Sequence, residues 1–318
     1  MATLYTEQSK NVRKTWLLMT IFFVIVIGLG WFFSLYYGDP NILYIFIIFS
    51  IVMNVVSYWF SDKIVLKLAG AQVAKREKFF DLYASVENLS IAGGLPMPKI
   101  YVVQDPAPNA FATGRDKNHA VICATTGLLA ILNKSELEGV IAHELSHIGN
   151  KDMLLSTVVV VLVGFVSILS DIFMRSVFWG GHRNSDNKSR GLLMLVGVIL
   201  SILAPVFAML IQLAISRKRE FLADASGALL TRYPEGLASA LRKISQYQRP
   251  MSRQSKAIAH LYIADPKGGL GSKGSFAPTA DSPLARNGGS ASQTREKKWQ
   301  HFFSTHPPVE ERIKALVG

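Results

Sequence analysis

The sequence predicts an α-helical integral membrane protein with four transmembrane helices and a cytoplasmic α+β domain. Half of the 318 residues are hydrophobic and only 18% are charged, which is too apolar for a typical soluble protein. Four segments are long and apolar enough to cross a bilayer, which takes about 20 residues as a helix. The remaining residues are polar enough to fold outside the membrane, and they contain short strand and helix patterns.

The predicted spans form two hairpins. They cover residues 15–37, 41–60, 153–174 and 192–215. The first hairpin, residues 1–60, closes through Gly38-Asp39-Pro40, which is too short for anything but a tight turn. Aromatic side chains gather near the ends of the first two spans, where amphipathic rings favour the headgroup level: Trp16, Trp31, Tyr36, Tyr37, Tyr58 and Trp59.

Basic residues predict the orientation of these spans. The turn at 38–40 carries no Lys or Arg, whereas residues 61–78 and 216–219 are rich in both. Because cytoplasmic loops carry the excess of positive charge, we expect the N-terminus and the segments 61–152 and 216–318 in the cytoplasm. The loop 175–191 disagrees, since it would face outward with a net positive charge. The opposite orientation would place still more basic residues outside.

The net charge of +12 is explained better by anionic lipid than by nucleic acid, because the basic residues lie beside the spans. No aromatic-interleaved basic stripe or nucleic-acid motif is present, so no nucleic-acid partner is expected. Cys123 is the only cysteine, which excludes an intrachain disulfide and allows a cytosolic setting. We expect Cys123 to pack within a strand.

The predicted soluble domain consists of two segments that must fold together. Residues 61–152 form its first part, and residues 216–318 form its second part, after the second transmembrane hairpin at 153–215. In the first part, residues 100–104 and 119–125 read as strands and residues 78–92 as an amphipathic helix.

In the second part of this domain, residues 234–248 read as a helix. Residues 265–298 are rich in Gly, Ser, Pro and Lys and have little apolar periodicity, so we expect a flexible loop. Its purpose is left open: a lid, a self-cleavage site and a neutral insertion all fit.

The most informative motif is His143-Glu144-Leu145-Ser146-His147. Ser135 and Glu138 are spaced as a capping box, and the apolar positions that follow predict a helix through the motif. The i, i+4 spacing then places both imidazoles on one face, where a single zinc ion can bind them. Glu144 lies beside them, in a position to take a proton from a water that the metal activates.

A catalytic zinc site keeps three protein ligands, so a third must come from elsewhere. His119, His182, His260, His301 and His306 are candidates, but Glu220 has the best context. His147 lies six residues before the third span and Glu220 five residues after the fourth, which puts both about 8 to 9 Å from the span ends. Asp224, one turn beyond Glu220, is placed to orient a ligand His. The alternative is that Glu220 and Asp224 lie on a solvated face of a helix and have no role at the metal.

These residues resemble the HtpX family of bacterial membrane metalloproteases, relatives of the CAAX prenyl proteases. The resemblance rests on His143-Glu144-x-x-His147, Glu220-x-x-x-Asp224 and the flanking spans, and it covers nearly the whole chain. It implies a zincin-like metalloprotease domain that holds one Zn²⁺ per chain through His143, His147 and Glu220. Glu144 would then be the general base, and Asp224 would support a ligand.

The resemblance also assigns roles to two further motifs. Asn109-Ala110-Phe111-Ala112 is similar to the edge strand that such proteases place beside the metal, where the Asn109 side chain and the Ala110 backbone would bind an extended peptide. His306-Pro307-Pro308 and Arg312 resemble a late His-Pro motif whose His and Arg would stabilise the oxyanion.

The function expected from this resemblance is zinc-dependent endopeptidase activity on membrane or membrane-associated proteins, in quality control or stress response. The expected location is the bacterial cytoplasmic (inner) membrane, with several passes through the bilayer and the active site facing the cytoplasm. Two alternatives stay open: a membrane scaffold or chaperone with a structural zinc of four ligands, and a metal transporter with polar residues along its spans.

Overall fold

The computed structural model describes residues 4–162, 217–247, 249–252, 258–264, 266 and 307–318. By their contacts these residues divide into two units. One consists of residues 4–65 and 151–162, and the other consists of residues 66–150 and the described residues from 217 onward.

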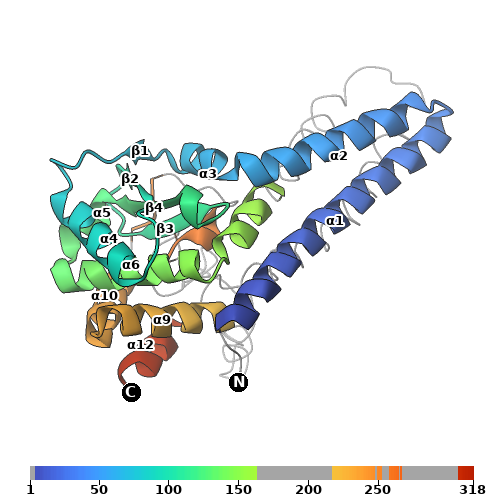
Figure 1. Ribbon diagram of the computed structural model, residues 1–318. Helices are drawn as coiled ribbons and strands as arrows, with labels where there is room; N and C mark the ends of the chain where they lie inside the picture. The colour runs from blue at the N-terminus through green and yellow to red at the C-terminus, as the bar shows by residue number, and fades with distance from the viewer. Residues whose placement is uncertain (1–3, 163–216, 248, 253–257, 265, 267–306) are drawn as a thin grey trace, which may run out of the picture. The chain divides into compact units, whose positions relative to one another are not determined.

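The first unit is built on a helical hairpin. Helices α1 (Leu4–Tyr37) and α2 (Asn41–Trp59) pack along each other (Figure 1). Gly38 has a φ of +69° in the turn, and the Asp39 side chain accepts a hydrogen bond from the Asn41 N–H at 2.9 Å. Both helices are long and apolar enough to cross a membrane, which confirms the first two predicted spans as helices of that kind.

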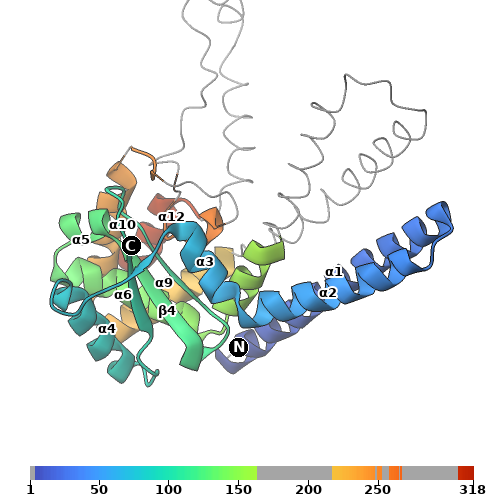
Figure 2. The ribbon, with the colours of Figure 1, turned by 90° about the horizontal axis from the view of Figure 1, so that it is seen from above.

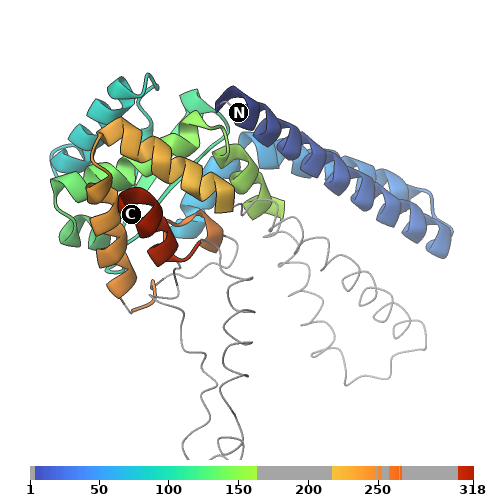
Figure 3. The ribbon, with the colours of Figure 1, turned by 90° about the horizontal axis from the view of Figure 1, so that it is seen from below.

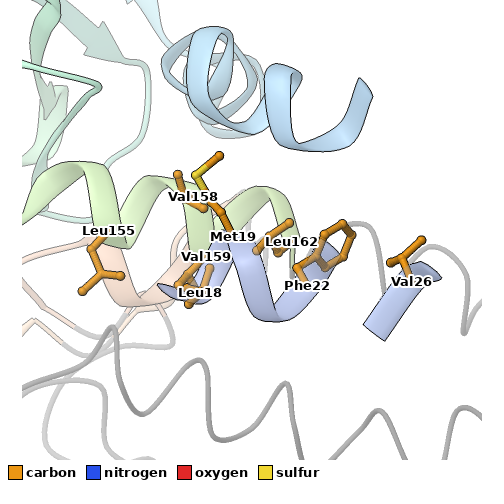
Figure 4. Close-up of a cluster of buried hydrophobic side chains, with 8 residues drawn as sticks. All are labelled: Leu18, Met19, Phe22, Val26, Leu155, Val158, Val159 and Leu162. Atoms are coloured by element: carbon orange, nitrogen blue, oxygen red, sulfur yellow. The ribbon is translucent and has the colours of Figure 1, made fainter. Parts of the chain in front are cut away.

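The third predicted span begins as a helix over Met153–Leu162. The Met153–Leu162 helix does not pass the test of length and composition by itself. It passes only when it is taken together with Lys134–Gly149 as a bent pair. The rest of this span and the whole of the fourth lie outside the described residues. Figure 4 shows how the Met153–Leu162 helix packs on α1 through a buried apolar cluster. The cluster consists of Leu18, Met19, Phe22, Val26, Leu155, Val158, Val159 and Leu162.

The second unit contains a four-stranded sheet in the order β1-β2-β4-β3. The strands are β1 (Gln72–Val73), β2 (Lys99–Val103), β3 (Ala110–Gly114) and β4 (Ala120–Thr125). β2 and β4 are parallel, while β1 pairs with β2 and β3 pairs with β4 in the antiparallel sense. The two strands predicted from the sequence are confirmed, and Cys123 is buried within β4 as expected. β3 lies at one edge of the sheet.

Helix α6 (Lys134–Gly149) lies at the centre of this unit. It contacts β3 and β4 on one side (Figure 2), and α4 (Phe80–Ala92), α9 (Arg217–Thr231) and α10 (Pro234–Gln246) elsewhere. α12 (Val309–Val317) packs on α9 and α10, as the view from below shows (Figure 3). The remaining described elements are α3 (Ser61–Ala69), whose first residues belong to the first unit, α5 (Thr126–Ile131), and the short helices η1 (Lys117–His119) and η2 (Ala259–Leu261).

Burial explains why α6 is central. Val140, Ile141, Ala142 and Leu145 are fully buried, and the polar side chains of Glu136, His143 and Glu144 on the same helix are buried as well. The neighbouring elements therefore enclose α6 on nearly every face. The helices predicted at 78–92 and 234–248 correspond to α4 and α10, each within two residues of its end. All of the predicted loop at 265–298 except Pro266 lies outside the described residues.

Candidate active site

The helix that carries the His-Glu-x-x-His motif begins with a capping box, though not the expected one. Asn133 is the N-cap: its side chain accepts a hydrogen bond from the Glu136 N–H, and the Glu136 carboxylate accepts one from the Asn133 N–H, both at 2.9 Å. The prediction of Ser135 and Glu138 was therefore wrong by two residues. Ser135 lies inside the helix and donates its hydroxyl to the Asn133 side chain. The helix still carries His143 and His147 on one face.

Two glycines let the neighbouring helices approach α6 closely. A Cβ on Gly139 would lie 2.6 Å from the backbone nitrogen of Leu237 in α10, and a Cβ on Gly227 would lie 3.0 Å from the backbone nitrogen of His143. Gly227 therefore brings α9 directly against the motif. Gly227 was not predicted from the sequence, although it lies one helical turn after Asp224 and therefore on the same face of the helix.

The three expected metal ligands converge. His143, His147 and Glu220 offer ligand atoms that all lie within 4.8 Å of one another. The two imidazole Nε2 atoms are 3.1 Å apart, and the Glu220 carboxylate oxygens lie 3.9 Å from His143 Nε2 and 3.8 Å from His147 Nε2. In a tetrahedral zinc site the ligand atoms are about 3.4 Å apart. The donor set and its spacing therefore fit zinc.

Asp224 orients His143. Its Oδ1 lies 2.9 Å from His143 Nδ1, and because a carboxylate only accepts, Nδ1 must carry the proton. That tautomer leaves the Nε2 lone pair free for a metal. Burial is the largest effect on His143 and lowers its pKa, so the ring is neutral, as a metal ligand must be.

Arg312 compensates the charge of Asp224. Its Nε and Nη2 donate to the two carboxylate oxygens at 2.8 and 2.6 Å, in the bidentate geometry that guanidinium groups favour. The side chains are 0% and 2% exposed. Burial alone would raise the pKa of Asp224, but Arg312 and His143 lower it to about 2. The sequence placed Arg312 at the site, but it did not indicate this pairing.

Glu144 is buried beside the ligands, against strand β3. Its carboxylate accepts a hydrogen bond from the Ala112 N–H, and its pKa is raised to about 7, chiefly by burial. A carboxyl group with a pKa near neutrality can accept a proton and return it. Glu144 therefore combines the position and the proton affinity of a general base.

The predicted substrate-binding residues and the other candidate histidines lie in different surroundings. Asn109 is buried, and its side chain binds both backbone groups of Ala264. The Ala110 carbonyl accepts a hydrogen bond from the Ile263 N–H. His306, His182 and His301 lie outside the described residues. His119 pairs with Asp116 at 2.9 Å, and neither it nor His260 belongs to the metal-binding group found among the described residues.

Known proteins resemble this chain over most of its length. The model of peptidase family M48 matches residues 76–318. The protease HtpX homolog of Caldanaerobacter subterraneus subsp. tengcongensis is 46% identical over 99% of this chain and 97% of its own length. The homolog of Thermoanaerobacter pseudethanolicus is 43% identical over the same shares. A crystal structure of S. mikatae Ste24p overlaps 95% of this chain and 62% of that chain, with a TM-score of 0.49 and 19% identity.

Proposed function

This chain belongs to peptidase family M48 and is an HtpX-type metalloprotease, and from that premise we propose that it is a zinc-dependent endopeptidase of membrane proteins. Its ligands would be His143, His147 and Glu220, with one Zn²⁺ per chain. The observation that carries the proposal is the convergence of these three side chains next to the buried carboxyl of Glu144.

The proposed reaction is hydrolysis of a peptide bond. Zinc, when bound, supplies a Lewis acid that activates water and polarises the scissile carbonyl. Glu144 accepts the proton of the attacking water and then protonates the leaving amine, which its raised pKa favours. Asp224 keeps the His143 ring in the tautomer that leaves Nε2 unprotonated. His306 and Arg312 are proposed to stabilise the oxyanion, and Asn109 and Ala110 to bind the substrate backbone.

The membrane setting is part of the proposal. The hairpin α1–α2 supports insertion in a bilayer, and we place four spans in the cytoplasmic membrane of a bacterium with the protease domain in the cytoplasm. Its substrates would be damaged or misassembled membrane proteins. Cys123 is buried, so single cysteines at Pro40 and Lys314 can report orientation in sealed vesicles. Labelling of Lys314→Cys from the outside would reverse the assignment.

The variant Glu144→Gln tests the chemistry. It keeps the size of the side chain but removes the base, so we expect hydrolysis of a labelled unfolded substrate to fall by about 10² to 10⁴-fold while the bound zinc content stays that of the parent protein. The matched control, His147→Ala, should lose zinc as well. Undiminished hydrolysis by purified Glu144→Gln would exclude this role.

A further inference from the structure

Strand β3 lies at the edge of the sheet, yet all five of its residues are buried. An edge strand normally presents unpaired backbone groups to its surroundings. Here a segment of the same chain, more than 140 residues later in the sequence, covers it. The Ile263 N–H donates to the Ala110 carbonyl at 3.0 Å, so the outer side of β3 already has a backbone partner at this position.

The contacts continue along the strand. The Asn109 side chain donates to the Ala264 carbonyl at 3.0 Å and accepts from the Ala264 N–H at 3.2 Å. The Tyr262 ring packs edge-on against Phe111, with centroids 5.2 Å apart. Residues 262, 263 and 264 thus lie beside residues 111, 110 and 109. The segment runs antiparallel to β3, as a peptide added to the sheet edge would.

A third contact connects this segment to the ligand cluster. Arg312 Nη1 lies 3.5 Å from the Ile263 carbonyl oxygen and 3.8 Å from Glu220 Oε2. The Ile263 carbonyl therefore faces the guanidinium that also binds Asp224. Asn109, Ala110 and Arg312 are the described residues to which we assign substrate binding or oxyanion stabilisation, and Ile263 and Ala264 contact all three.

We propose that Tyr262–Ile263–Ala264 is a built-in peptide that occupies the substrate-binding edge, so that a substrate strand must displace it. This inference rests on the proposed function. If the segment must leave first, only the molecules in which it is displaced can bind substrate. The apparent affinity for substrate is then the intrinsic affinity multiplied by the fraction of such molecules. The contacts also indicate which peptides compete well: extended segments with an aromatic side chain opposite Phe111.

The variant Ile263→Pro tests the inference in the full-length, zinc-loaded protein. Proline has no N–H to donate to Ala110, so the segment binds less firmly. We expect the KM for fluorescently labelled casein to fall by about fivefold, the equivalent of one typical hydrogen bond, with kcat unchanged. The matched control, Ile263→Val, keeps the N–H and should retain the parent KM. A KM that is unchanged or raised in a properly folded Ile263→Pro protein would overturn the proposal.

A second measurement needs neither hydrolysis nor that variant. In Glu144→Gln, amide hydrogen exchange at Ile263 and Ala264 should quicken when unlabelled casein is bound, because the segment is released, while β4 amides stay protected. Unchanged or slower exchange at Ile263 with casein bound would refute displacement. The two proposals can fail separately. If the parent protein hydrolyses no substrate that the Glu144→Gln variant leaves intact, the proposed function fails. Hydrogen exchange would still report whether bound casein displaces the segment.

Discussion

Two clusters around buried carboxylates tie α6 to its neighbours, and they differ in how their charge is compensated. Near the start of α6, Glu136 accepts from Ser239 and Lys243 of α10, each at 2.7 Å, and Lys243 is 42% exposed. At His143, Asp224 of α9 is held by Arg312 of α12, and none of these three side chains is more than 2% exposed. One cluster reaches solvent, and the other is closed.

The difference separates a structural role from an orienting role. A charge pair with one solvated partner costs little to form and contributes little. A fully buried pair carries a large desolvation cost and is a weak means of gaining stability. We therefore attribute the Asp224–Arg312 pair to the fixed orientation of His143, and the Glu136 cluster to the start of α6. Four predictions test this contrast.

The largest effect is expected from Arg312→Met. It leaves the Asp224 carboxylate buried without its guanidinium, and breaking a buried pair in this way lowers the free energy of unfolding by about 3 to 5 kcal/mol. Denaturant unfolding in detergent measures the loss. The double variant Asp224→Asn with Arg312→Met removes both charges and should recover part of it. A double variant no more stable than Arg312→Met would contradict this explanation.

The next effect is on the metal. Asp224→Asn weakens the hydrogen bond that fixes the His143 tautomer, so zinc affinity should fall by about 10- to 100-fold. Competition with a chelator of known affinity measures it. Glu136→Gln is the control, because Glu136 contacts α10 rather than a ligand, and its zinc affinity should equal that of the parent. Equal losses in both variants would remove the distinction between the clusters.

A smaller effect is expected for Glu136→Gln on stability. The amide keeps the shape of the side chain but loses the charge that Lys243 and the Asn133 N–H bind. Because Lys243 is partly solvated, we expect a loss of only about 1 kcal/mol in the free energy of unfolding. A loss as large as that of Arg312→Met would show that solvent access does not distinguish the clusters.

The smallest effect is a dependence on pH. Burial alone would raise the pKa of Glu136, but Lys243, the Asn133 N–H and Ser239 lower it below 4.5. A lowered folded-state pKa means that this stabilisation is complete above the unfolded value of about 4.5 and is lost as pH falls through the folded value. As pH falls below 4.5, the free energy of unfolding of the parent should therefore decrease more steeply than that of Glu136→Gln. If the free energies of unfolding of the two proteins depended on pH in the same way, the protonation of Glu136 would not contribute to the loss of stability.

Much of the site could be predicted because its signals are local. Helical periodicity places His143 and His147 on one face whatever surrounds them, and the apolar hairpin and strands β2 and β4 follow from similarly short patterns. Glu220 was inferred from its distance to a predicted span. The cap was misplaced by two residues because Asn133, Ser135, Glu136 and Glu138 overlap as signals, and only the backbone path shows which residue begins the helix.

The sequence by itself determined the chemistry available to this protein: two imidazoles and a carboxyl group one helical turn apart, on a chain apolar enough for a membrane. Tertiary structure alone decided which partners those groups have. Arg312 is 88 residues from Asp224, and Ala264 is 155 residues from Asn109. No local pattern relates such pairs, because they are brought together by the packing of α9 on α6 and of α12 on α9, and by residues 262–264, which lie along β3.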